Sequence, residues 1–196
     1  KCAQKIAAGE KDKINVTPAM VKAMLGPEKV KPTFISRTDA VGIANGLAWT
    51  SVGGEMLPIE VSIIPNGSGK VEITGSLGDV MKESAHLALT YARVHAETYH
   101  ITPDKFKNTD IHIHAPEGAV PKDGPSAGVT LTTALISALS EIPVRHDLAM
   151  TGEITLHGNV LPIGGLKEKS MEAFREGIST VLIPEANKPD LYEVDE

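Results

Sequence analysis

The sequence is poor in the features that identify secreted, disulfide-stabilised or membrane proteins. Its 196 residues include one cysteine, Cys2, so no disulfide can form within the chain, which is typical of a reducing compartment. Apolar runs fall short of the roughly 18 residues that a membrane-spanning helix needs. The first 13 residues, KCAQKIAAGEKDK, contain no apolar stretch of a secretory signal peptide. We therefore expect no membrane contact.

Positive charge is also scarce. Lysine and arginine number 19 against 25 acidic residues, which gives a net charge of −6, and the basic residues form no visible stripe. Nucleic acid is therefore not an expected partner. Apolar residues make up 41% of the chain, enough for a real core in one or two domains.

The first 31 residues differ in character from the rest. The stretch VTPAMVKAMLG predicts a short helix in which Thr17 is the N-cap, Pro18 is the first helical residue and Gly26 ends the helix. The chain begins without methionine and in the middle of a pattern, so we expect a fragment of a longer protein.

Two prolines mark a connector after this helix. Pro27 and Pro32 interrupt any regular structure. We therefore predict a domain boundary near residue 32, between a helical segment over residues 1–31 and a main domain over residues 32–196.

The main domain mixes strand and helix patterns. Residues 56–64 and 71–74 are expected to form a hairpin through PNGSGK, whose glycines and asparagine are typical of a turn. PNGSGK lacks the spacing of a phosphate-binding loop. Strands and helices then alternate without a strict βαβ rhythm, which favours an α+β or mixed α/β fold. The other expected helices cover residues 78–100, 126–139 and 167–177, and the other strands cover 110–114, both sides of HGN (157–159), and 179–184.

The stretch DIHIH places two imidazoles on one face of a strand, because side chains alternate along a strand. His112 and His114 have a spacing that can hold a metal ion. However, no cysteine or third histidine lies nearby in the sequence, so a supporting structural role is the alternative.

Ser126 stands out in PKDGPSAGVTL, directly before a helical apolar run. It can be a helix N-cap, a role for which Asp123 also qualifies. GPSAG also matches the Gly-x-Ser-x-Gly nucleophile elbow, and Asp147 and His157 follow in the order of a Ser-His-Asp triad. The strand that an elbow requires is missing, however, since residues 115–125 are predicted to be loop.

A second pattern, LPIGGLKEKSMEAFREG, begins a helix with Lys167 and Lys169 after a pair of glycines. A lysine at a helix N-terminus is disfavoured while it is charged. Burial lowers the pKa of its amine in the same direction, so the neutral amine can accept a serine proton. Backbone N–H groups at the beginning of the Ser126 helix could then bind a developing oxyanion.

These stretches, together with MTGEITLHGNV and VLIPEANKPDL, resemble the proteolytic domain of the Lon family of ATP-dependent serine proteases over about residues 33–192. The resemblance implies that Ser126 is the nucleophile and that Lys169 is its general base in a Ser-Lys dyad. It implies that Thr151 binds the lysine amine. Lys167 should then face solvent.

The resemblance assigns further positions more loosely. Asp123 would adjust the loop before the serine, and a contact between Asp123 and Lys169 would favour the charged amine and oppose catalysis. Glu60, His112 and His114 match positions near the family site.

At the level of the whole protein, the resemblance implies a soluble bacterial or mitochondrial type that degrades unfolded or misfolded polypeptides, as a hexamer, in the cytoplasm or the mitochondrial matrix. Residues 1–31 resemble the end of an AAA+ helical subdomain. ATP and magnesium would be bound by that ATPase module, and no cofactor is expected in this chain. The family domain usually continues with another strand and helix. A catalytically silent assembly module and a Ser-His-Asp hydrolase are the alternative functions.

Overall fold

The computed structural model of the chain describes residues 1–9, 13–26 and 36–194. It divides into two compact units, Lys1–Thr33 and Phe34–Glu196. The predicted boundary near residue 32, with Pro27 and Pro32, lies outside the described residues.

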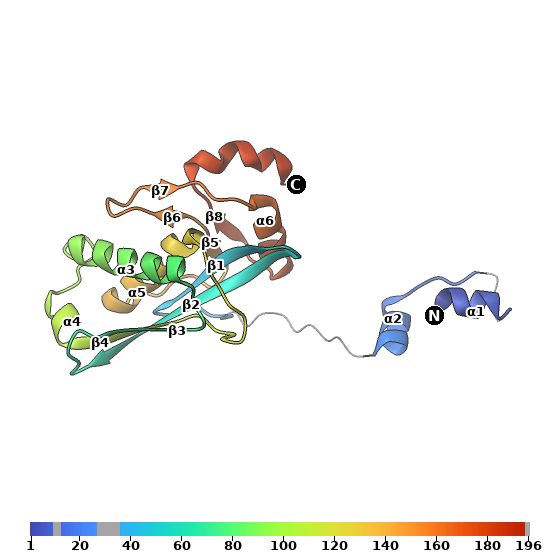
Figure 1. Cartoon of the computed structure of the whole chain (residues 1–196), viewed down its shortest axis with the longest axis horizontal. Helices are drawn as coiled ribbons and strands as arrows, with labels where there is room; N and C mark the ends of the chain where they lie inside the picture. The colour runs from blue at the N-terminus through green and yellow to red at the C-terminus, as the bar shows by residue number, and fades with distance from the viewer. Residues whose placement is uncertain (10–12, 27–35, 195–196) are drawn as a thin grey trace. The chain divides into compact units, whose positions relative to one another are not determined.

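In its described residues, 1–9 and 13–26, the first unit contains two short helices, α1 (Cys2–Ala7) and α2 (Pro18–Leu25) (Figure 1). The hydroxyl of Thr17 accepts a hydrogen bond from the N–H of Met20 at 3.3 Å, Pro18 is the first helical residue and the helix ends at Gly26. The N-cap, first residue and end predicted for this helix are therefore confirmed.

The second unit is built on a six-stranded mixed sheet in the order β3-β4-β2-β1-β5-β8. Among these strands β2 alone runs antiparallel to its neighbours, while β3–β4, β1–β5 and β5–β8 are parallel pairs. Sheet and helices together confirm the α+β prediction. The strands are β1 (Ile43–Thr50), β2 (Gly53–Pro65), β3 (Val71–Thr74), β4 (Thr109–His114), β5 (Leu148–Met150) and β8 (Thr180–Leu182), and a separate pair is β6 (Glu153–Ile154) and β7 (Val160–Leu161).

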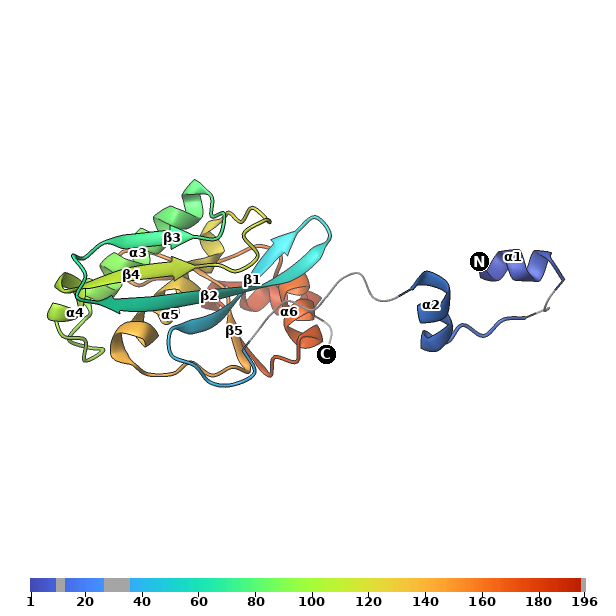
Figure 2. The ribbon, with the colours of Figure 1, turned by 90° about the horizontal axis from the view of Figure 1, so that it is seen from below.

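The helices of this unit lie on both faces of the sheet. Figure 2 shows α3 and α5 behind the strands β2, β3 and β4. Their bounds are α3 (Asp79–Val94), α4 (Asp104–Lys107), α5 (Gly128–Ser140) and α6 (Leu166–Arg175), with the 3₁₀ segments η1 (Pro125–Ala127) and η2 (Glu185–Glu193).

The predicted hairpin between residues 56–64 and 71–74 is wrong. These residues form strands, but β4 lies between β2 and β3 in the sheet, and the hairpin partner of β2 is β1. Strands that are close in the sequence need not pair when a later strand with an apolar face can lie between them. Strand β4 is such a strand, because its Ile111 and Ile113 are buried. The expected turn is held to β4 because a carboxylate oxygen of Asp110 accepts the N–H groups of Ser68 and Lys70 at 2.8 and 2.9 Å.

Two apolar cores separate along β1 and β2 because side chains alternate between the faces of a strand. Ala44 and Ile59 pack into the large core beneath α3 and α5. Leu47 and Met56 point the other way, into a small core with Ala173 of α6. Thus α5 and α6 cover opposite faces of one sheet.

The apolar face of α3 does not include every large apolar residue of the helix. Ala85, Leu89 and Ala92 are buried, but Val80 and Val94 are 44% and 69% exposed. The helix turns instead toward Met81, Ser84 and Ala88, which are buried.

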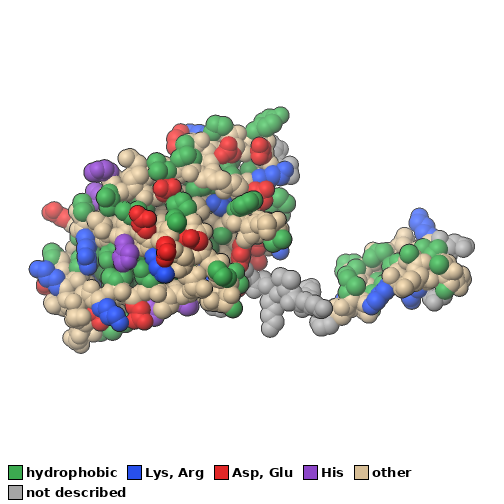
Figure 3. All heavy atoms as spheres, viewed as in Figure 1, with side chains coloured by type: hydrophobic (Ala, Val, Ile, Leu, Met, Phe, Trp, Pro, Cys, Tyr) green, Lys and Arg blue, Asp and Glu red, His purple; other side chains and the backbone are tan. Residues whose placement is uncertain are grey.

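The surface of the second unit carries mixed charges on the face seen in Figure 3, where acidic and basic side chains lie among apolar ones. Within the part of the chain that the structure describes, no helix combines the length and apolarity needed to cross a membrane.

Candidate active site

Ser126 lies in the 3₁₀ turn η1, directly before α5. The predicted helix over residues 126–139 therefore begins two residues later, at Gly128, and its N-cap is Ala127. Neither η1 nor α5 has a side-chain capping bond, so the interpretation of Ser126 as a cap is wrong. The Ser126 carbonyl accepts the N–H of Gly152 at 2.8 Å, which fixes the backbone while leaving the hydroxyl available.

Lys169 comes from the first turn of α6, where its N–H donates to the carbonyl of Gly165 at 3.0 Å. Only 2% of the residue is exposed, which is rare for a lysine. Lys167, two residues earlier, is exposed, as expected if Lys169 has the functional role.

The two side chains meet at the carboxyl end of β5. Lys169 Nζ lies 3.3 Å from Ser126 Oγ and 3.1 Å from Thr151 Oγ1. Thr151 directly follows β5, and its hydroxyl donates to the Ser126 carbonyl at 3.4 Å, so its lone pairs are available to the amine. Strands β1 and β5 are parallel, so their carboxyl ends share this edge of the sheet, a usual location for ligand sites.

Burial lowers the pKa of the Lys169 amine from its ordinary 10.5 to about 8, because the charged form loses its hydration. An ion pair with a carboxylate would raise the pKa of this amine again, but among the described residues no carboxylate forms one. A substantial fraction of Lys169 is therefore neutral near pH 8 and can accept a proton.

Asp123 contacts another element. One carboxylate oxygen accepts the N–H of Met81 at 3.0 Å and that of Gly124 at 2.9 Å. Met81 is in the first turn of α3, whose N-cap is Gly78, so Asp123 supplies the capping carboxylate that a glycine cannot. The side chain ties the loop before Ser126 to α3, and the contact with Lys169 that would oppose catalysis is not formed in the described part of the chain.

Glu60, His112 and His114 lie on the sheet, and none of the three lines the cleft that contains Ser126. Glu60 pairs with His114 across β2 and β4. The hydroxyl of Thr74 lies 2.9 Å from His112 Nε2 and 2.7 Å from His114 Nδ1. One O–H donates only once, so one ring nitrogen accepts from Thr74 and the other donates to it. In the described ranges no three His, Cys, Asp or Glu side chains are placed to hold a metal.

Ser126 and Lys169 open into a cleft of about 870 Å³. Its walls are residues 48–50 and 55–57 of the β1–β2 hairpin, the loop 120–127 and the segment 162–169. A cleft of this size accommodates several residues of an extended peptide.

The hairpin and α6 approach each other so closely that only glycine fits at two contacts. A Cβ on Gly54 would lie 2.1 Å from the carbonyl oxygen of Glu168. A Cβ on Gly165, whose φ is +69°, would lie 2.6 Å from the ring of Trp49. Trp49 was not predicted from the sequence to line the cleft, although the glycine pairs in VGGE and IGGL are typical of a close approach of two backbones.

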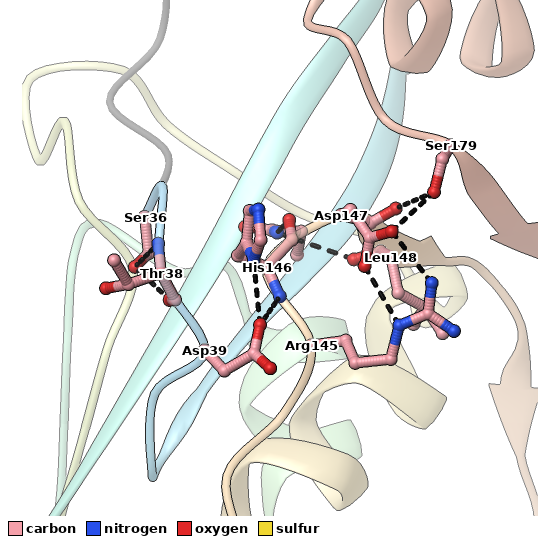
Figure 4. A network of polar contacts seen from close by, with 9 residues as sticks. Ser36, Thr38, Asp39, Arg145, His146, Asp147, Leu148 and Ser179 are labelled. Carbon is pink, nitrogen blue, oxygen red and sulfur yellow. Dashed lines mark hydrogen bonds and ion pairs between the residues drawn. The ribbon is translucent and has the colours of Figure 1, made fainter.

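The residues of the alternative triad are occupied elsewhere. Asp147 accepts both guanidinium N–H groups of Arg145, at 2.9 and 2.7 Å, and the hydroxyl of Ser179 at 2.6 Å, contacts that hold the Asp147 pKa well below its usual range (Figure 4). His157 lies in the turn between β6 and β7 and does not line the cleft. The structure therefore brings neither residue to Ser126.

Comparisons with known proteins agree with a peptidase site. The sequence model of the Lon protease (S16) C-terminal proteolytic domain matches residues 15–196. Lon proteases from Trichlorobacter lovleyi and Geobacter metallireducens are 55% and 54% identical to the chain over 99% of its length. Lon protease 2 of Thermus thermophilus is 52% identical over the same share.

These matches show that the chain is a proteolytic domain. The chain belongs to the Lon protease family. It spans about a quarter of the length of these relatives, 24% in each case.

We predict that Thr151→Val, which replaces the hydroxyl with a methyl group of similar size, lowers kcat for peptide hydrolysis about 10-fold with little change in KM. The variant removes the acceptor that orients Lys169 but leaves the cleft walls in place. Steady-state kinetics on an unstructured fluorogenic peptide measures the effect. Thr90→Val on α3, whose hydroxyl donates to the His86 carbonyl, is the matched control. A Thr151→Val enzyme with the parent's kcat would contradict a role of the Thr151 hydroxyl in orienting the Lys169 amine.

Proposed function

We propose that the chain is the proteolytic part of an ATP-dependent serine endopeptidase that degrades unfolded or misfolded polypeptides through a Ser126–Lys169 dyad. The observation that carries the proposal is a buried lysine amine 3.3 Å from a serine hydroxyl that caps no helix. This distance is slightly longer than a tight hydrogen bond, as is common for nucleophile and base before substrate binds.

The reaction begins with neutral Lys169. Its amine takes the Ser126 proton as Oγ attacks the scissile carbonyl, and the resulting ammonium then protonates the leaving amine. An acyl ester on Ser126 remains. In the second half, Lys169 deprotonates a water molecule that hydrolyses the ester and regenerates the free hydroxyl.

The attack places negative charge on the carbonyl oxygen of the substrate, and this charge needs hydrogen-bond donors. The N–H groups of Ser126 and Ala127 in η1 are suited to this role, because a helix N-terminus favours negative charge, whereas those of Gly128 and Val129 in α5 already donate to the carbonyls of Pro125 and Gly152. The bonds from Gly152 and Thr151 to the Ser126 carbonyl would keep that turn rigid while the charge develops.

An extended polypeptide suits the cleft. Strand β1 pairs with β2 along its whole length but with β5 only at Asn45 and Gly46. The backbone of residues 48–50, which lines the cleft, is therefore paired on its β2 side and can accept a substrate strand on the other. A folded domain cannot present such a strand, which favours unfolded substrates.

The proposal extends to the whole protein. ATP and magnesium would act in an AAA+ module of the same full-length chain, and the hydrolytic step at Ser126 itself needs no cofactor. We propose a homohexamer that encloses the clefts, and a cytoplasmic location, since the relatives named above are bacterial.

The pH dependence of hydrolysis tests the proposal. Only neutral Lys169 accepts the Ser126 proton, so kcat/KM is expected to rise about tenfold per pH unit below pH 7 and to level off above about 8. Hydrolysis of an unstructured fluorogenic peptide between pH 5.5 and 10 measures this limb. A midpoint near 6.5, the ordinary pKa of histidine, would contradict a lysine base and favour the Ser-His-Asp alternative.

A further inference from the structure

The segment Pro162–Gly165 connects β7 to α6 and serves two purposes at the cleft. It forms part of the wall, and its last residue begins the helix that carries Lys169. Because the Lys169 N–H donates to the Gly165 carbonyl, a displacement of this segment moves the backbone of Lys169 with it. The position of the amine therefore depends on what holds the segment.

On one side the segment is held by a side chain from η2. Asn187 is 2% exposed, and its Oδ1 accepts the N–H of Ile163 at 2.9 Å while its Nδ2 donates to the Ile163 carbonyl at 2.8 Å. The amide thus pairs with both polar backbone atoms of Ile163, as a neighbouring strand would. A third bond, from Nδ2 to an Asp190 carboxylate oxygen at 2.6 Å, fixes the orientation of the amide.

The other side of the segment is packed against the hairpin. Gly165 lies against the Trp49 ring so closely that a Cβ would collide with it. The segment is therefore clamped between the indole of β1 and the amide of η2. Loss of the hydrogen bonds from the Asn187 side chain would free one side of the segment. The N–H and carbonyl of Ile163 would then need water molecules as hydrogen-bond partners.

We propose that Asn187 is a positioning residue for Lys169, which holds the Pro162–Gly165 segment in place and keeps water away from the lysine amine. The inference rests on the proposed function, because it assigns a second support to the same base. It also gives η2, which follows the last strand of the sheet, a direct connection to the active site.

Asn187→Ala is expected to lower kcat/KM at pH 8 by about 10²-fold, the size of effect that a displacement of about 1 Å in a catalytic group produces. Because water then reaches the amine, the midpoint of the pH–rate profile should move upward from about 8 toward 10.5. A loss of folded protein alone would reduce the rate at every pH without moving the midpoint. The control is Lys188→Ala, which removes an exposed ion pair with Glu185 in the same segment and should leave rate and midpoint unchanged.

A second variant covers the case in which Asn187→Ala does not fold. Asn187→Asp keeps the size of the side chain and the acceptor for the Ile163 N–H but loses the donor, and it should also shift the midpoint upward. A folded Asn187 variant with the parent's midpoint overturns the proposal. If neither variant retains the parent's melting transition, the amide is a folding element and the positioning role is likewise overturned.

A failure of the proposed function can be distinguished from a failure of the positioning role of Asn187. It would appear in the parent protein, as a midpoint far from 8 or as activity that survives removal of the Ser126 hydroxyl, whatever the Asn187 variants do.

Discussion

Lys169→Met is expected to abolish peptide hydrolysis and at the same time to make the protein more stable. The replacement keeps an unbranched side chain of similar length but removes the base, which should cost about 10²- to 10⁴-fold in kcat. The acyl-enzyme should fail to form as well, because Lys169 Nζ is the group that contacts Ser126 Oγ in the described part of the chain and would take its proton.

The gain in stability has a separate cause. At pH 7 the protonated amine is buried in the folded chain and hydrated in the unfolded chain, and a pKa of about 8 against 10.5 corresponds to about 3 kcal/mol of unfavourable free energy. Methionine carries no such cost, so the free energy of unfolding should rise by up to about that amount. For a domain of this size that is a Tm increase of roughly 6–12 °C.

The sign of the pH dependence makes this prediction specific. Between about pH 8 and 10.5 the unfolded chain binds more protons at this lysine than the folded chain, so the stability of the parent rises with pH. The advantage of Lys169→Met should therefore be full below pH 8 and shrink toward pH 10.5. Lys167→Met, at an exposed position of the same helix, is the control for stability and should show no such gain. Equal melting temperatures of parent and Lys169→Met at pH 7 would contradict a desolvated amine.

Local signals explain which parts of the fold could be predicted. The α2 helix was predictable to the residue because Thr17, Pro18 and Gly26 act through their own backbone neighbours. The strand β4 was predictable from its alternation. The pairing of β2 with β4 was not, because it depends on residues about 50 positions apart in the sequence, and a turn signal cannot tell which strand will follow it in the sheet.

The same distinction applies to the site. The residue types around Ser126 and Lys169 indicated a nucleophile and a base, but the two residues are 43 positions apart, and the sequence between them carries no local information about their distance in space. The capping role of Asp123 depends on the N-terminus of α3, which the sequence offers no way to connect with residue 123. Asn187 was visible only as part of a motif, because its bonds to the active-site segment run to the backbone N–H and carbonyl of Ile163, which any type of residue would offer.

Ser126→Ala should eliminate hydrolysis, with a loss on the order of 10⁴- to 10⁶-fold, because of the two described hydroxyls that contact Lys169 Nζ, those of Ser126 and Thr151, only Ser126 lines the cleft. Stability should change little, since Lys169 retains its contact with Thr151 and the Ser126 carbonyl keeps its bond to Gly152. The matched control is Ser140→Ala at the last residue of α5, the helix that follows Ser126. Its hydroxyl oxygen is buried without a hydrogen-bond partner in the described residues, so its removal should be neutral for activity.

Mass spectrometry of the protein during turnover separates the remaining explanations. The parent should carry an acyl adduct on the peptide that contains Ser126, and Ser126→Ala should carry none. His157→Ala should acylate like the parent, because His157 lies outside the cleft, and loss of the adduct in that variant would restore the Ser-His-Asp alternative. A parent that neither hydrolyses peptide nor forms an adduct would favour the silent assembly module. Since Ser126 Oγ and Lys169 Nζ lie 3.3 Å apart, such a protein would have its nucleophile and base in place and would lack only a bound substrate or a neighbouring subunit.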